Sequence, residues 1–124
     1  METLKLEPTS DTPKVILDAT AGIFEISDRC FPEDAIRFFT PILEWVKWYL
    51  ESPNHTTTHF NFKLEYFNTA SSKQLFKLFV LLQELSKKNE VIIHWYYNNG
   101  DTDMLSSGER YSQLLDFPFD MVEM

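Results

Sequence analysis

The segment His59–Phe67 alternates polar and apolar residues, and this pattern restricts the folds that the chain can adopt. Every second side chain of a strand points to the same face, so Phe60, Phe62, Leu64 and Tyr66 are expected to lie together. A strand enclosed between two layers of helices is apolar at nearly every position, whereas this one also has a polar face. We therefore predict a sheet whose helices lie mainly on one side.

Apolar patterns place further elements before and after this strand. Short apolar runs predict strands, and apolar residues spaced by three or four predict helices. The expected strands cover Lys14–Asp18, Gly22–Ile26, Val91–Tyr97 and Phe117–Val122, with a short edge strand at Leu4 and Leu6. The expected helices are a region from Phe31–Asp34 to Ser52–Asn54, with Ile36, Phe39, Leu43 and Val46 on its buried stripe, and the segments from about Ser71 to Lys88 and from Met104 to Leu115.

Two details of these helices stay open at the level of sequence. Pro41 lies inside the first helical region, so either the helix kinks there or Thr40 caps a second helix. The segment Ser106–Gly108 either interrupts the last helix or delays it. Strand–helix–strand connections of this length favour parallel neighbouring strands. The expected fold class is therefore α/β, with one domain over residues 1–124 and a mixed, mostly parallel sheet.

Composition excludes several classes of protein. The 124 residues are 44% hydrophobic and 24% charged, as is typical of a globular domain. Cys30 is the only cysteine, which excludes an internal disulfide and suits a reducing, cytoplasmic setting. No apolar run approaches the roughly 20 residues of a membrane span, and no signal peptide is recognised, so no membrane partner is expected. A net charge of −8 disfavours binding to nucleic acid.

Residues able to support catalysis do not form a known motif. His55, His59 and His94 supply three imidazoles, but no acidic residue has a spacing typical of a zinc site. Asp101 and Asp103 start like a cation-binding loop, yet the later ligands are missing and a turn explains them more simply. The sequence also lacks a glycine-rich phosphate loop. We therefore expect no catalytic residue, no metal and no cofactor.

Small polar residues crowd the segment Asn68–Lys73, where a strand is expected to give way to a helix. Open α/β sheets place functional groups at such carboxyl ends of strands. Asn68, Thr69 or Ser71 can act as a helix N-cap, which any helix requires. Alternatively, one hydroxyl accepts a phosphate, because free amides and the positive end of the helix dipole stabilise an anion there.

Positive charge is concentrated in the helix that follows. Residues 71–88 contain four lysines and one glutamate, so this segment carries +3 and the remainder of the chain −11. Lys73 and Lys77 share a helical face close to the amino end, where cations are disfavoured. An anion at this end, either an acidic partner or an added phosphate, would account for them. A solvated basic face is the simpler alternative.

The segment Phe67–Lys73 after an alternating strand, together with Pro41–Trp45 and Tyr49, resembles the SiaC family of bacterial regulatory phosphoproteins. The resemblance covers nearly the whole chain and implies an architecture like that of STAS and anti-sigma-factor-antagonist domains. It implies that Thr69 is the phosphoacceptor. The environment that we expect around it consists of neighbouring polar and basic residues: Asn68, Ser71, Ser72, Lys73 and Lys77.

The resemblance also implies a non-enzymatic role as a partner switch. A cognate serine/threonine kinase and a phosphatase are the expected partners that set the state of Thr69. The unmodified form is then expected to bind and stimulate a diguanylate cyclase, which links the switch to cyclic-di-GMP and biofilm signalling.

Two other functions compete with this interpretation. A constitutive interaction module would use Trp45, Trp48 and Tyr49 as an aromatic surface, because tryptophan and tyrosine are favoured anchors. The same spacing also suits burial of at least one of these rings. A small hydrolase would require His59 and His94 to converge in a pocket.

Overall fold

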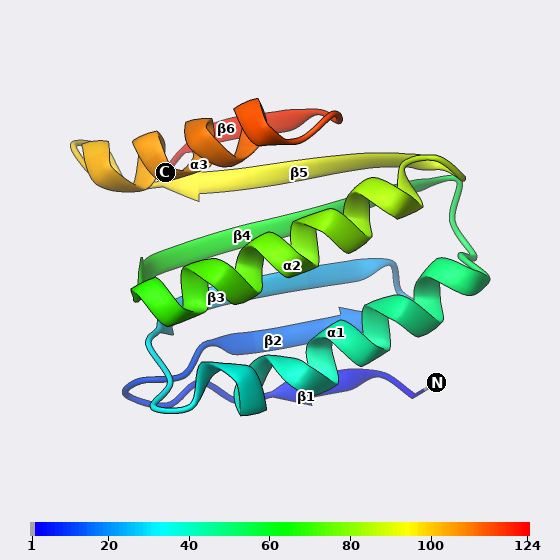
Figure 1. Ribbon diagram of the computed structural model, residues 1–124, viewed down its shortest axis with the longest axis horizontal. Helices are drawn as coiled ribbons and strands as arrows, with labels where there is room; N and C mark the ends of the chain where they lie inside the picture. Colours follow the sequence, from blue (N-terminus) through cyan, green and yellow to red (C-terminus); the bar gives the residue numbers. More distant parts are fainter. Residues whose placement is uncertain (1) are drawn as a thin grey trace.

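The sheet has two parts that differ in strand direction (Figure 1). The computed structural model describes residues 2–124. Its strands are β1 (Leu4–Leu6), β2 (Lys14–Asp18), β3 (Ile23–Cys30), β4 (Thr57–Phe67), β5 (Glu90–Tyr97) and β6 (Phe119–Glu123), and its helices are α1 (Ala35–Glu51), α2 (Thr69–Leu85) and α3 (Thr102–Leu114). Strands β1 to β3 are antiparallel, whereas β3 to β6 are parallel.

The strand order explains why all three helices cover the same face. The spatial order follows the chain from β1 to β6, so each parallel crossover moves in the same direction across the sheet. Right-handed crossovers in one direction all place their helices on one side, as Figure 1 shows. The predicted α/β class with helices on one face is confirmed, and it is consistent with a STAS-like fold. The three helices also begin at the same edge, beside the carboxyl ends of β3, β4 and β5.

The predicted alternation of buried and exposed residues in β4 holds as far as Leu64. Phe60, Phe62 and Leu64 are buried under the helices. The prediction for Tyr66 was wrong, since its side chain is 53% exposed. The pairing of β3 with β4 shifts by one residue between Asp28 and Arg29, which reverses the alternation beyond that point. Phe67 therefore takes the partly buried position against the core.

Helix α1 is continuous through its proline. Pro41 lies inside Ala35–Glu51 and faces solvent, so the alternative of two helices was wrong. The Thr40 hydroxyl donates to the carbonyl of Ile36 at 2.7 Å and does not cap a second helix. Ile36 was also assigned incorrectly to the buried stripe, because it is 65% exposed. The stripe instead consists of Ala35, Phe39, Ile42, Trp45, Val46 and Tyr49.

Helix α3 is not interrupted at its glycine. Gly108 is buried inside α3, and a Cβ at this position would lie 2.4 Å from Cδ1 of Trp95. The glycine thus allows α3 to sit directly on the central tryptophan of β5. Helix α2 begins at Thr69 and ends at Leu85, so its predicted limits were displaced by two to three residues.

No helix within residues 2–124 combines the length and the apolar character that crossing a membrane would require.

Candidate functional site

The three helices begin at one edge of the sheet, and each is capped by a side chain. Asp34 accepts from the amide of Arg37 at the start of α1. Asp101 accepts from the amide of Met104 at the start of α3. The middle helix, α2, is the exception because its cap, Asn68, is uncharged.

The first turn of α2 leaves backbone amides available. The Asn68 side chain accepts from the Ser71 amide at 2.9 Å, and the Asn68 amide donates to the Cys30 carbonyl at 3.1 Å. Asn68 is therefore the N-cap among the three candidates that the sequence offered. Within residues 2–124, the amides of Thr69 and Ala70 have no hydrogen-bond acceptor. These amides lie at the positive end of the α2 dipole, where an anion is stabilised.

The hydroxyls of this segment differ sharply in accessibility. Ser71 is fully buried, so a modifying enzyme has no route to it. The Ser72 hydroxyl lies 2.8 Å from the Tyr111 hydroxyl, which also donates to the Ser72 carbonyl at 3.0 Å. Thr69 is exposed, and its hydroxyl makes no hydrogen bond with the described residues. Of the three, Thr69 alone is both accessible and free.

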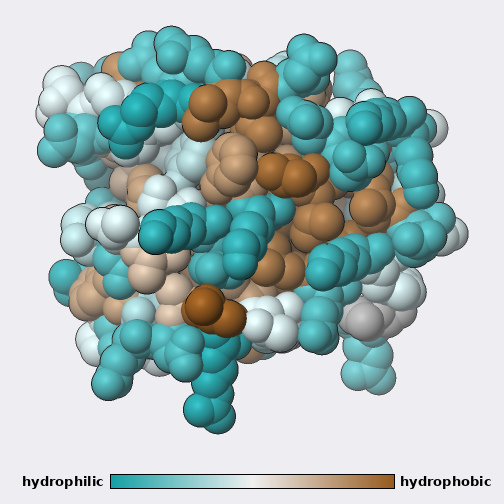
Figure 2. Space-filling model, viewed as in Figure 1, coloured by the Kyte–Doolittle hydropathy of each residue, from teal (hydrophilic) through white to brown (hydrophobic). Residues whose placement is uncertain are grey.

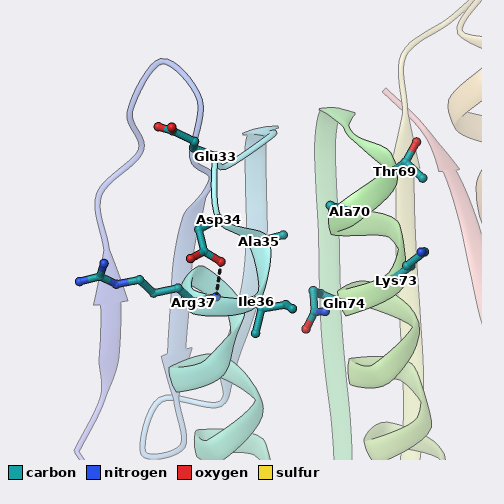
Figure 3. Close-up of a pocket in the computed structure, with 9 residues that line it drawn as sticks. All are labelled: Glu33, Asp34, Ala35, Ile36, Arg37, Thr69, Ala70, Lys73 and Gln74. Carbon is teal, nitrogen blue, oxygen red and sulfur yellow. Dashed lines mark hydrogen bonds between the residues drawn. The ribbon is translucent and has the colours of Figure 1, made fainter.

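Thr69 lies between two cavities. The larger, of about 890 Å³, separates the first turns of α1 and α2 and is lined by residues from Glu33 to Arg37 and from Thr69 to Gln74 (Figure 3). Figure 3 shows the Thr69 and Lys73 side chains on the same side of α2, directed away from α1. The Arg37 side chain extends away from both. The available cation on this helix is therefore Lys73, one turn after Thr69.

The smaller cavity, of about 380 Å³, connects Thr69 to α3. Its wall includes Arg110 together with three acidic residues, Glu65, Asp101 and Asp103. Arg110 is not among the site residues predicted from the sequence. Its spacing from Ser107 places both on one face of α3, but only the tertiary structure shows that this face meets α2.

The single cysteine lies next to the first turn of α2, where its carbonyl accepts from the Asn68 amide, and its thiol is buried. Cys30 is buried, and burial raises the pKa of its thiol from 9.0 to about 11, with the nearby Ser71 hydroxyl acting in the opposite direction. A thiol that stays protonated at neutral pH is a poor nucleophile. Burial also raises the pKa of the Tyr111 hydroxyl.

The aromatic surface proposed on α1 does not exist as a unit. Trp45 and Tyr49 are 3% and 2% exposed and stack on each other at 5.6 Å in the core. Trp48 alone reaches solvent, at 37% exposure. The expectation that at least one of the three rings is buried is confirmed, because Trp45 and Tyr49 belong to the buried stripe of α1, so the alternative of an aromatic surface retains only Trp48.

The histidines converge, but on the other side of the molecule. Nδ1 of His59 lies 2.8 Å from Nε2 of His94, whose Nδ1 lies 3.0 Å from a carboxylate oxygen of Asp120. These side chains occupy the sheet face opposite the helices, and they do not line either cavity beside Thr69. His55 is engaged elsewhere, at 2.6 Å from the Ala19 carbonyl. Within residues 2–124, no group of three or more His, Cys, Asp and Glu residues is arranged to hold a metal ion.

Comparisons with known proteins agree with this arrangement of elements. The sequence model of the SiaC family regulatory phosphoproteins matches residues 6–124. An uncharacterized protein of Pseudomonas aeruginosa strain UCBPP-PA14 is 25% identical over 120 residues, which are 96% of this chain and 94% of the relative. The structure of SiaC of Pseudomonas aeruginosa superimposes with a TM-score of 0.88 at 24% identity over 100% of both chains. A chain in the crystal structure of the diguanylate cyclase SiaD in complex with its activator SiaC, from the same organism, gives a TM-score of 0.90 at 24% identity and covers 98% of this chain and 99% of that one.

Proposed function

The chain belongs to the SiaC family of regulatory phosphoproteins, and we propose that it is a non-catalytic partner switch controlled by phosphorylation of Thr69. One observation carries this proposal. Thr69 is an exposed threonine with a free hydroxyl, at the first position of a helix whose first amides are unpaired and whose cap is uncharged. The family match supports a phosphoprotein, and the geometry supports this particular hydroxyl.

The proposed target is a diguanylate cyclase. The Pseudomonas aeruginosa SiaC that this chain resembles in fold is an activator of the cyclase SiaD. By the same logic the unmodified form of this protein binds and stimulates its own cyclase, in cyclic-di-GMP and biofilm signalling. A dedicated serine/threonine kinase and a phosphatase set the state of Thr69, and the cytoplasm is the setting in which these partners meet.

The energetic requirement for such a switch is modest. A phosphate on Thr69 adds about −1.5 to −2 charges at neutral pH. Its oxygens meet the amides of Thr69 and Ala70, and Lys73 lies one turn away. A hundredfold loss of affinity corresponds to about 2.7 kcal/mol, which one desolvated or repelled dianion can supply. The added charge and bulk remove the contacts that a partner makes with the unmodified edge.

The test compares two threonines in equivalent positions. Thr102 is the first residue of α3 and is exposed like Thr69, but its cap is a carboxylate. The protein is isolated from cells that contain its kinase, and its intact mass and modified residue are determined by mass spectrometry. We expect one phosphate on the wild type and on Thr102→Ala, and none on Thr69→Ala. Phosphate uptake by Thr69→Ala at the wild-type rate would refute the site, and a phosphorylated protein that still activates the cyclase would refute the switch.

A further inference from the structure

A groove runs between α2 and α3, directly beside Thr69. We call it the α2–α3 groove and define it by Lys73, Phe76 and Lys77 on α2 and by Arg110, Tyr111 and Leu114 on α3. Its volume is about 470 Å³. Helices α1 and α2 pack closely along their length, whereas α2 and α3 do not approach each other in this way.

The walls of the groove present large apolar side chains to solvent. Leu114 is 69% exposed, Phe76 is 38% exposed, and Val80, one turn beyond Phe76, is 40% exposed. Figure 2 shows hydrophobic surface gathered over α2 and in the region between α2 and α3, crossed by hydrophilic side chains. The other aromatic ring of α2, Phe79, is buried in the core. Contiguous apolar surface of this kind marks a contact site in a soluble protein.

The charge of the groove is opposite to that of the protein. Lys73, Lys77 and Arg110 lie along it, and the lining residues, all within the described part of the chain, include no aspartate or glutamate. Among residues 2–124, none of these three cations forms an ion pair with a carboxylate. A protein with a net charge of −8 thus places three cations that form no ion pair around one apolar groove, although Arg110 also lines the smaller cavity with Glu65, Asp101 and Asp103.

We propose that the α2–α3 groove binds an amphipathic helix of the regulatory partner, with an apolar stripe flanked by Asp and Glu residues. Phe76 lies on the α2 wall, with the exposed Val80 one turn further along the helix, and Tyr111 and Leu114 lie three residues apart on the α3 wall. A groove between two helices can bind a third helix, because the side chains of the third helix pack between those of the other two. The three cations select acidic residues beside the apolar stripe of the bound helix.

This inference deepens the partner switch proposed above, because the groove and Thr69 share residues. Lys73 lines both the groove and the larger cavity that contains Thr69. Arg110 lines both the groove and the smaller one. A phosphate on Thr69 competes for these two side chains and leaves Lys77 alone to attract the acidic partner. Phosphorylation therefore weakens binding by removing the charge complementarity of the groove.

The test uses two synthetic peptides of about five helical turns. Both carry leucines at three- and four-residue spacing. The flanking positions are glutamates in one peptide and lysines in the other. Fluorescence anisotropy is measured with the unmodified protein, so the result does not depend on whether Thr69 is phosphorylated. We expect the acidic peptide to bind about tenfold more tightly than the basic one, with the difference reduced by salt.

Matched variants locate the binding site. Lys77→Glu combined with Arg110→Glu should reverse the preference between the peptides, whereas Lys47→Glu combined with Lys87→Glu, which changes the charge equally outside the groove, should preserve it. Leu114→Gln should weaken binding of the acidic peptide about tenfold, because the bound peptide would bury this exposed leucine side chain. Ile23→Gln replaces an exposed apolar residue on the opposite sheet face and should have no effect. All of these positions are exposed, so the fold is retained.

Several outcomes would overturn the proposal. These are no binding of the acidic peptide, equal binding of both peptides, or equal losses in the groove variants and their controls. Tighter binding of a single-stranded oligonucleotide would make the groove a nucleic-acid site. A dimer that Leu114→Gln dissociates would assign the groove to a second copy of this chain. Phosphorylation of Thr69 in cells is measured separately, so either proposal can fail while the other stands.

Discussion

Helices α2 and α3 begin at the same edge of the sheet, and each begins with an exposed threonine that follows a capping side chain. At α3 the cap is Asp101 and the first turn also contains Asp103, so carboxylates already compensate the helix dipole. At α2 the cap is the neutral Asn68, and no acidic residue lies in the first turn. The two helix starts therefore differ in charge, and under the proposed function this difference is what makes Thr69, and not Thr102, the site for a phosphate.

The two helices also differ in how they are held. Helix α2 packs beside α1 and contributes fully buried side chains to the core, whereas α3 contacts Trp95 through a glycine, and a groove separates it from α2. The proposed modification site lies on α2, the better packed of the two helices, and the apolar groove lies between α2 and α3. This arrangement suits a switch. A charge added at the start of α2 changes the neighbouring groove, while the buried side chains of α2 keep the domain folded.

The largest expected effect tests this difference on two phenylalanines of α2. Phe79→Ala removes a fully buried ring that packs on Phe62 at 5.0 Å and should lower the free energy of unfolding by about 3–5 kcal/mol. Phe76→Ala shortens a side chain that is 38% exposed and should change it by less than about 1 kcal/mol. Urea denaturation measures both. Equal losses would mean that Phe76 belongs to the core and that the α2–α3 groove is not open.

The second effect compares the two threonines in partner binding. Thr69→Asp places a negative charge beside Lys73 and should weaken binding to the cyclase up to about a hundredfold, or about 2.7 kcal/mol. Thr102→Asp makes the same change next to carboxylates and should alter binding by less than about twofold. Titration calorimetry with the purified cyclase measures both affinities. Similar losses for the two variants would show that the whole edge, and not the α2 start, contacts the partner.

The third effect concerns the contact between Gly108 of α3 and Trp95 of β5. Gly108→Ala adds a methyl group where Cδ1 of Trp95 lies 2.4 Å away, so the helix must move outward, and we expect a loss of about 1–3 kcal/mol in stability. Helix propensity alone would instead give a gain of about 1 kcal/mol. Ser106→Ala, at an exposed position of the same helix, serves as the control and should be neutral or slightly stabilising. A more stable Gly108→Ala variant would mean that α3 is not fixed against the tryptophan.

The sequence predicts much of the fold, because the spacing of hydrophobic residues along a short segment indicates whether that segment forms a helix or a strand. The alternation of His59–Phe67 predicted a sheet covered on one side, and the helices between successive strands predicted parallel neighbours. Tyr66 was misplaced because its alternation is reversed by a shift in pairing with another strand, which no local pattern reports. Ile36 was misplaced because the partners of a helix decide which of two overlapping stripes is buried.

The candidate site divides in the same way. The segment around Thr69 can be recognised from sequence, because a cap, small hydroxyl residues and a following helix are adjacent in the chain. Ser71 could be excluded as a phosphoacceptor only because the structure shows that it is buried. Ser72 could be excluded only because the structure shows its hydrogen bond to Tyr111, which is 39 residues away in the chain. Arg110 and Leu114 can be recognised as lining a groove only when the structure shows that α3 lies beside α2. The start of α2 and its capping residue were predictable from the sequence, whereas the surface shared by two helices was not.

The smallest effect isolates the cap itself. Asn68→Ala removes the acceptor of the Ser71 amide and should cost about 1 kcal/mol of stability, whereas Asn68→Asp keeps the acceptor and gives α2 the same anionic cap that α3 has. Asn68→Asp should therefore be as stable as the wild type or more stable by about 0.3–1 kcal/mol. Its helix start is then already compensated, so phosphorylation of Thr69 should raise the melting temperature of the wild type but leave that of Asn68→Asp unchanged or lower it. Differential scanning calorimetry of the four species measures this, and an equal rise in both proteins would show that the neutral cap does not favour the phosphate.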